Sequence, residues 1–190
     1  MTEEFKLEKQ EKKILLKLAR ETIESYARTG QKPEPPPPDK LTEALKSRRG
    51  AFVSLHKKGE LRGCIGLFEG RGPLFQTIQE MAVAAGFEDP RFPALNPSEL
   101  KELEIEISVL GPLQKCRAEE VKVGKHGIYI TRGFNRGVLL PQVATEYCWD
   151  RETFLNQTCV KAGLAPQAWK EPGTQIEVFC AEVFNEKDWA

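Results

Sequence analysis

Two hairpin patterns constrain the fold of this 190-residue chain more than any other feature. In the first, FVSLH (52–56) and LRGCIGL (61–67) flank the turn-like KKGE. The second is HGIYITRGFNRGVLLP (126–141), with glycine and asparagine around its turn. LEIEISVL (103–110) alternates apolar and polar side chains as a half-buried strand does. Strands that come as hairpins predict an α+β fold with an antiparallel or mixed sheet flanked by helices.

Three other segments have the apolar periodicity of helices. The first ends at Gly30. The second has Pro73 as its first helical residue and Gly86 at its C-terminal cap. The third is capped by Asp150 and ends at Gly163. The last strand, TQIEVFCAEVF, is apolar on both faces at its middle, so we expect it to be central.

The connector after the first helix, KPEPPPPDK (32–40), contains four consecutive prolines. Proline cannot continue a helix and favours extended polyproline geometry. We interpret the segment as a stiff connector, in preference to a recognition motif for a proline-binding domain.

The charge balance excludes some classes of function. Lys and Arg number 28, as do Asp and Glu, so the net charge is zero and no basic field attracts nucleic acid. No apolar stretch is long enough to span a membrane, and the charged N-terminus does not resemble a secretory signal. We therefore expect a cytoplasmic protein that binds neither membranes nor nucleic acid.

Five cysteines form neither a disulfide framework nor a metal site in our interpretation. Their number is odd, no pair has CxxC spacing, and neither His56 nor His126 lies in a ligand pattern with a cysteine. We expect most of the thiols to behave as small buried hydrophobic groups.

Cys64 is the first candidate for chemistry. Glycine inside a strand marks a bulge or a close backbone approach, and Cys64 has Gly63 and Gly66 around it. Arg62 is two residues away, so on a regular strand the two side chains would share a face and the cation would lower the thiol pKa, whereas a distortion at Gly63 would alter that geometry. Backbone N–H groups at the glycines could hold an anion. The alternative is a buried structural cysteine beside a bulge.

The second candidate is the loop EDPRF (88–92), in which Asp89 and Arg91 flank a proline. The two charges could bind a polar ligand, because functional groups are often carried by loops. Alternatively they form a loop salt bridge, with Phe92 anchoring the loop to the core.

The third candidate follows the second hairpin and includes Gln142, Glu146 and Trp149. Glu146 could be a general base or a ligand-binding carboxylate, or equally a solvated helix residue. His126 would be the natural partner of Cys64 in a Cys–His nucleophile site. We favour a histidine of the turn.

These motifs together resemble the AMMECR1 domain family. LRGCIG (61–66) matches the family's hallmark hexapeptide, and AAGFEDPRFPAL, LEIEISVL, HGIYI, GVLLPQVATEYCWDRETFL and CVKAGL follow in order. The resemblance implies a single α+β domain of two unequal lobes, a larger one of residues 1–60 plus 110–190 and a smaller inserted one of residues 61–109, with the hexapeptide near the cleft between them. Carried over by position, the family's motif residues are Arg62, Gly63, Cys64, Gly66, Asp89, Arg91, Phe92, Gln142, Glu146 and Trp149.

The resemblance supplies no settled reaction and no cofactor. Similar proteins occur beside, or fused to, Memo-like and radical-SAM proteins, which are therefore expected partners. The hypothesis that we favour is an enzyme for a small polar or anionic substrate, with Cys64 as nucleophile, Arg62 and backbone N–H groups at an oxyanion, and Glu146 or His126 moving protons. The alternative is a non-catalytic module that binds a ligand or a partner protein.

Overall fold

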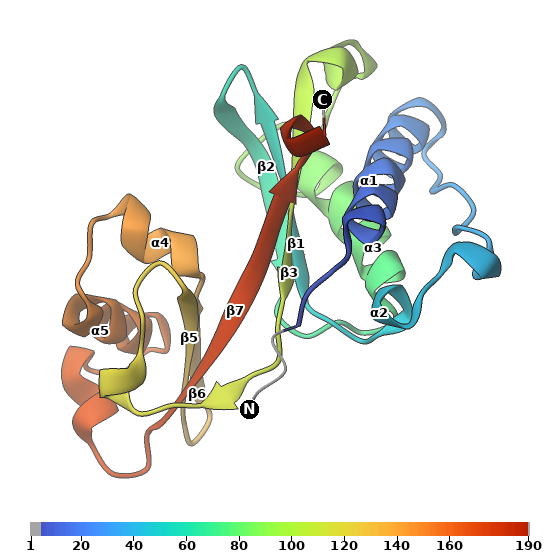
Figure 1. Ribbon diagram of the computed structural model, residues 1–190. Coiled ribbons are helices and arrows are strands. Elements are labelled where there is room, and N and C mark those ends of the chain that lie inside the picture. Colours follow the sequence, from blue (N-terminus) through green and yellow to red (C-terminus); the bar gives the residue numbers. More distant parts are fainter. Residues whose placement is uncertain (1–4, 190) are drawn as a thin grey trace. The chain divides into compact units, whose positions relative to one another are not determined.

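The chain forms two compact units in the computed structural model, which describes residues 5–189 (Figure 1). Unit 1 comprises residues 1–110 and 182–190, and unit 2 comprises residues 111–181. Each unit has its own cluster of buried apolar side chains. The segment 61–109, which the resemblance assigned to a separate lobe, lies wholly in unit 1, because its strands pair with residues 51–57 there.

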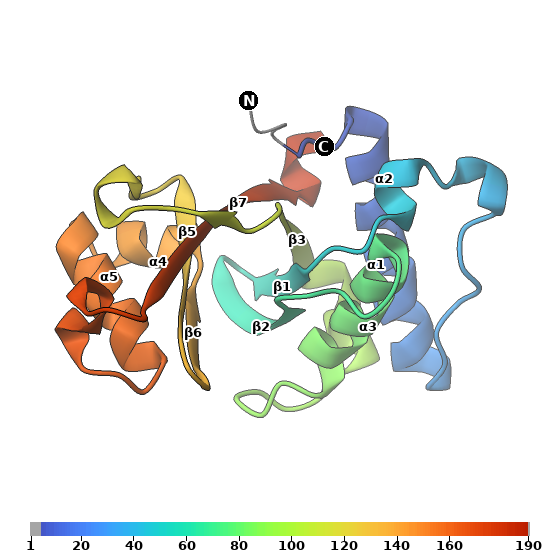
Figure 2. The ribbon, with the colours of Figure 1, turned by 90° about the horizontal axis from the view of Figure 1, so that it is seen from below.

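Unit 1 contains an antiparallel sheet and two long helices. The strands β1 (Ala51–Lys57), β2 (Glu60–Leu67) and β3 (Leu103–Leu110) are arranged in the order β2-β1-β3. Helices α1 (Lys9–Thr29) and α3 (Leu74–Phe87) lie side by side on one face of this sheet (Figures 1 and 2). Between them they bury the alternate apolar residues of β1 and β3. The connector leads through short 3₁₀ and α turns, Pro38–Lys40 and α2 (Glu43–Lys46).

Local signals in unit 1 mostly predicted the ends of its elements. Gly30 ends α1 with φ of 71°, in the left-handed conformation that favours glycine. The β1–β2 loop turns on Lys58 and Gly59, both with positive φ, as in a type I′ hairpin. The prediction that Gly86 caps α3 was wrong, since the helix continues through Phe87. Gly86 instead accommodates the Leu95 side chain, which an added Cβ would approach within 2.8 Å.

Unit 2 is a second antiparallel arrangement with helices against it. Strand β7 (Gln175–Asn185) pairs with β4 (Gln114–Lys115) on one side and β5 (His126–Arg132) on the other, as expected of a central strand. Strand β6 (Asn135–Leu139) completes the hairpin with β5. Helices α4 (Pro141–Glu146) and α5 (Arg151–Lys161) follow, and Asp150 caps α5 by accepting a hydrogen bond from the Thr153 N–H (2.7 Å). The last residues of β7, 182–185, belong to unit 1.

The α+β prediction is therefore confirmed, with every strand pairing given above antiparallel. No helix within residues 5–189 has the length and apolar character needed to cross a membrane.

Candidate functional site

A β-bulge interrupts strand β2 beside Cys64. Leu55 of β1 pairs with Gly63, but the next residue, His56, pairs with Leu61, so Arg62 is the extra residue. This confirms the predicted break in strand regularity. Beyond the bulge, Cys64 lies directly opposite Ser54.

The two glycines of the hexapeptide are sites of close packing. A Cβ added at Gly63 would lie 2.1 Å from the carbonyl oxygen of Ala85, so the backbone of α3 touches the strand there. A Cβ at Gly66 would lie 2.2 Å from the ring of Phe52, which packs across the strand. Both positions thus require glycine for steric reasons. Their role in ligand binding stays a prediction.

The backbone of Cys64 is held from outside the sheet by Asp89 and Arg91. The Cys64 N–H donates to Asp89 Oδ2 (2.9 Å), and Arg91 Nη2 donates to the Cys64 carbonyl oxygen (3.2 Å). Strand β2 is the edge strand of the unit 1 sheet, so these are groups that a neighbouring strand would otherwise bond. The loop after α3 therefore takes the place of a strand at this one residue.

Asp89 and Arg91 are also bound to each other. Arg91 donates to both carboxylate oxygens of Asp89, from Nε to Oδ1 (3.0 Å) and from Nη2 to Oδ2 (2.7 Å). Asp89 is buried, and the hydrogen bond from Arg91 holds the pKa of its carboxyl far below the usual range. The predicted loop salt bridge is present. Together with the bond from the Cys64 N–H, it engages both carboxylate oxygens of Asp89.

Arg62 does not contribute to the pKa of the Cys64 thiol, contrary to the expectation from a regular strand. Its Nε and Nη2 donate to the two oxygens of Glu99 (both 3.1 Å). Lys57 Nζ binds the same carboxylate (3.0 Å). The hydrogen bonds from Arg62, from the Asn96 N–H and from Lys57, in order of decreasing effect, lower the pKa of Glu99 to about 2. The bulge explains the difference, because it places Arg62 out of the alternation that would have set it beside Cys64.

The Cys64 thiol is half-buried, and its surroundings do not lower its pKa. Burial raises its pKa, and the hydrogen bond that Ser54 Oγ donates to Cys64 Sγ (3.1 Å) offsets this only in part. Of the nearby charges, Arg91 lowers this pKa, while Asp89 and Glu106 raise it. The environment is therefore the opposite of the cationic one that activates a nucleophilic cysteine.

Polar side chains gather on the sheet face that carries the thiol. Cross-strand partners share a face, so Cys64, Ser54 and Glu106 form one row across β2, β1 and β3. His56 and Glu104 lie opposite each other on the same face. We call these five residues the Cys64 face. They are all half-buried, on the side of the sheet away from the core residues of α1 and α3.

In the part of the chain that the structure describes, His56 and Glu106 have side-chain polar atoms to which no other residue is bound. The Nε2 atom of His56 is buried and has no hydrogen-bond partner among the described residues. Glu104 binds Lys187 Nζ (2.6 Å), whereas within residues 5–189 Glu106 is in no ion pair. Our sequence analysis missed Ser54, His56, Glu99 and Glu106. The alternation of LEIEISVL and FVSLH carried the signal for three of them, since it separates their polar face from the apolar one.

The remaining candidates lie in unit 2. His126 Nδ1 accepts a hydrogen bond from the Lys122 N–H (3.2 Å), which fits a histidine of the turn, and burial lowers its pKa. Gln142 and the exposed Glu146 stand on α4, and Trp149 packs against the unit 2 core. Cys64 belongs to unit 1, so its partnership with His126 or Glu146 of unit 2 stays a prediction.

An unusual turn separates Glu146 from Trp149. Cys148 is exposed and has φ of 53°, a conformation that costs energy for any residue except glycine. The exposed ring of Tyr147 stacks on Trp149 with centroids 5.0 Å apart.

Comparisons with known proteins agree with the motifs. The family model AMMECR1 matches residues 16–184. A protein of Methanothermobacter thermautotrophicus is 43% identical over 95% of this chain and 96% of its own length. One of Methanopyrus kandleri is 44% identical over 96% of this chain and 92% of its own length. The crystal structure of an uncharacterized protein from Pyrococcus horikoshii is similar with a TM-score of 0.79 and 40% identity, covering 91% of this chain and 90% of that one. The chain therefore belongs to the AMMECR1 family.

Proposed function

We propose that the Cys64 face is a non-catalytic binding site for a small polar ligand. The observation that carries this proposal is the row of Cys64, Ser54 and Glu106, together with His56 Nε2 on the same face, which has no hydrogen-bond partner within residues 5–189. A buried polar atom without a partner, such as His56 Nε2, costs free energy, and a ligand with a matching hydrogen bond would recover it. Asp89 and Arg91 hold the strand rigid, so the site is ready before the ligand arrives.

The charges of this face favour a neutral or cationic ligand over an anionic one. Among the described residues Glu106 is in no ion pair, and Arg62, the cation expected to attract an anion, is bound to Glu99. An amine or amide group that donates to Glu106 would satisfy it, while a carboxylate there would add a like charge. The ligand class is thus a small molecule with hydrogen-bond donors.

A fragment screen followed by backbone amide NMR tests the proposal. We expect amines and amides to shift the signals of Ser54, Cys64 and Glu106, and Glu106→Gln to weaken their binding about tenfold, the loss of one charge-assisted hydrogen bond. Glu104→Gln is the matched control on the same strand and face, and we expect a smaller effect because Glu104 binds Lys187. Preferential binding of carboxylic acids would contradict the charge argument, and binding that is unchanged by Glu106→Gln would contradict the site.

The enzyme hypothesis makes the opposite prediction for the thiol. If Cys64 were the nucleophile, with Glu146 or His126 as its base, a substrate-like electrophile would label Cys64 faster than a model thiol at neutral pH. The raised pKa of Cys64 disfavours this outcome. Slow labelling together with ligand binding would support the binding module.

From the family resemblance we further propose that this cytoplasmic module works with Memo-like and radical-SAM proteins. The test is size-exclusion chromatography of the purified proteins, alone and mixed. A shared peak would support the association, and separate elution at micromolar concentrations would contradict a stable complex.

A further inference from the structure

The proline-rich connector, residues 32–40, lies outside the site described above and is held in place at both ends. At one end the Pro33 carbonyl oxygen accepts a hydrogen bond from Gln79 Nε2 of α3 (3.1 Å). At the other end Thr42 donates to the buried carboxylate of Glu11 in α1. The conformation of the connector is therefore fixed before any partner binds, which lowers the entropy cost of binding.

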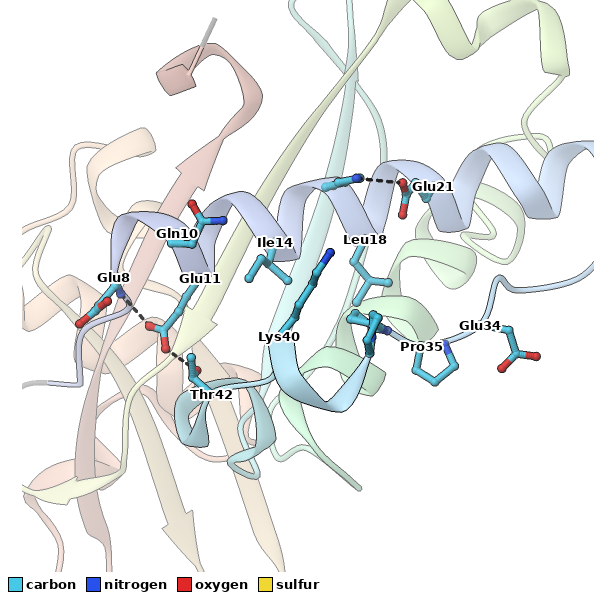
Figure 3. A pocket seen from close by; sticks show the side chains of 13 residues that line it. Glu8, Gln10, Glu11, Ile14, Leu18, Glu21, Glu34, Pro35, Lys40 and Thr42 are labelled. Atoms are coloured by element: carbon cyan, nitrogen blue, oxygen red, sulfur yellow. Dashed lines mark hydrogen bonds and ion pairs between the residues drawn. The ribbon is translucent and has the colours of Figure 1, made fainter.

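The connector presents proline rings and free hydrogen-bond acceptors. Pro37 has φ of −54° and ψ of 142°, close to the values of a polyproline II helix. Pro35, Pro37 and Pro38 are exposed, and a groove of about 550 Å³ separates the connector from α1 (Figure 3). Among the described residues, no group donates to the carbonyl oxygens of residues 34–36. Aromatic side chains recognise such segments, because they pack on the prolines and can donate to the carbonyl oxygens.

The turn between α4 and α5 carries the complementary groups. The Tyr147 ring is 65% exposed and stacks on Trp149, and we call these two residues the aromatic pair. Trp149 packs against the unit 2 core, which fixes the pair in place. Within residues 5–189, neither the Tyr147 hydroxyl nor the Trp149 indole N–H has a hydrogen-bond partner. The aromatic pair thus supplies the apolar surface and the donors that a proline segment lacks.

Charges of both signs accompany the two surfaces and can pair between them. On the connector, Glu34 points away from α1 (Figure 3), and Asp39 and Lys40 follow the prolines. Beside the aromatic pair are the exposed Glu146 and the exposed Lys122, which lies on a loop that contacts α4. In the part of the chain that the structure describes, none of these five residues is in an ion pair. Each surface can therefore receive both charges of the other.

We propose that the connector of one copy of this protein docks on the aromatic pair of a second copy. The exposed prolines pack on the Tyr147 ring, while the Tyr147 hydroxyl and the Trp149 indole N–H donate to carbonyl oxygens of residues 34–36. Each copy carries both surfaces, so two copies can bind each other reciprocally, which is the arrangement of a two-fold dimer. The unpaired charges add selectivity more than affinity, because exposed ion pairs contribute little in water.

An NMR titration of the ¹⁵N-labelled protein with a synthetic peptide of residues 32–40 tests the contact. We expect saturable shifts of the Tyr147 amide and the Trp149 indole signals, because the free peptide takes the place of the second copy's connector. In the control peptide, alanine replaces the four consecutive prolines. It keeps every charge but loses the stiff polyproline geometry, so it should bind at least about tenfold more weakly.

Sedimentation equilibrium of the full chain measures the association itself. We expect the average mass to rise with concentration. Tyr147→Ala removes a ring and a donor, and should weaken both association and peptide binding about tenfold. Phe134→Ala is the matched control: it removes another exposed aromatic ring of unit 2, at the turn between β5 and β6, and should leave both measurements unchanged.

Three results would overturn the proposal: no saturable shifts at the aromatic pair, equal affinity of the two peptides, or equal association of Tyr147→Ala and the unaltered protein. Peptide binding by a chain that stays monomeric up to about 1 mM would also overturn it, because the occupant would then be a proline-rich segment of another protein. Thermal unfolding shows whether each variant is folded. Tyr147 and Phe134 are both exposed, so we expect both variants to fold.

Discussion

Two cysteine motifs, the strand segment around Cys64 and the turn around Cys148, differ in how many hydrogen bonds from other segments hold them in place. Cys64 has its N–H, its carbonyl oxygen and its thiol all hydrogen-bonded to residues of other segments. Cys148 lies on an exposed turn with φ of 53°, held by a local hydrogen bond from its N–H to the Thr145 carbonyl (3.2 Å). The segment around Cys64 is thus held by several contacts from other segments, and its thiol is half-buried. The turn around Cys148 has strain and an accessible thiol.

Removal of Asp89 beside Cys64 should cause the largest loss of stability. Removal of Asp150, which follows Cys148, should cause a smaller one. Asp89→Ala leaves the Cys64 N–H and the Arg91 guanidinium without their acceptor, so we expect a loss of about 3 kcal/mol in the free energy of unfolding. Asp150→Ala beside the second motif removes one exposed helix cap and should cost less. Denaturant unfolding measures both. Equal losses would contradict the difference in fixation.

Acid should remove the stabilisation that the Glu99 carboxylate provides by binding Arg62 and Lys57. The pKa of Glu99 is lowered from 4.5 to about 2 in the folded protein, so the unfolded chain binds a proton here at a higher pH than the folded one. The stabilisation is therefore complete above pH 4.5 and is lost as the pH falls toward 2. We expect Glu99→Gln to cost about 2 kcal/mol at pH 7 and to lose most of this effect near pH 2.

Unfolding free energies measured at several pH values provide the check. Glu146→Gln in the exposed second motif serves as control and should change stability little at any of them. A pH-independent cost of Glu99→Gln would show that the carboxylate charge does not carry the effect.

Alkylation should distinguish the two thiols. We expect iodoacetamide to modify Cys148 at least about tenfold faster than Cys64 at pH 7.5, because Cys148 is exposed while Cys64 is half-buried with a raised pKa. Peptide mass spectrometry over time measures each site. Faster modification of Cys64 would instead favour the nucleophile hypothesis.

Replacement of each cysteine by glycine should change the stability least, and the change should have opposite signs at Cys148 and Cys64. Cys148→Gly relieves the left-handed strain and should stabilise the protein by about 0.5 kcal/mol. Cys64→Gly removes a packed side chain and its hydrogen bond with Ser54, and should destabilise it by about 1 kcal/mol. Thermal unfolding of the two variants gives the comparison, and the same sign for both would contradict it.

Sequence patterns predicted the fold well because their causes are local. The alternation of LEIEISVL reports which side of β3 is buried, and Gly63 marked the bulge through its missing side chain. The partner of Arg62 at this bulge was not predictable from the sequence, because it is Glu99, 37 residues away. The same holds for Asp89, whose bond to the Cys64 N–H spans 25 residues. Chemistry of the candidate site is set by such distant partners, and a single sequence does not pair them.

The loop bonds at Cys64 also bear on how copies of this protein behave when they meet. An open edge strand is a template on which another chain can add a strand and start aggregation. On β2, Asp89 and Arg91 occupy the donor and acceptor of Cys64, and the bulge at Arg62 disturbs the register just before it. An incoming strand would have to displace an ion pair to bond there. The residues that hold Cys64 in place thus also hinder another copy of the chain from adding a strand to β2.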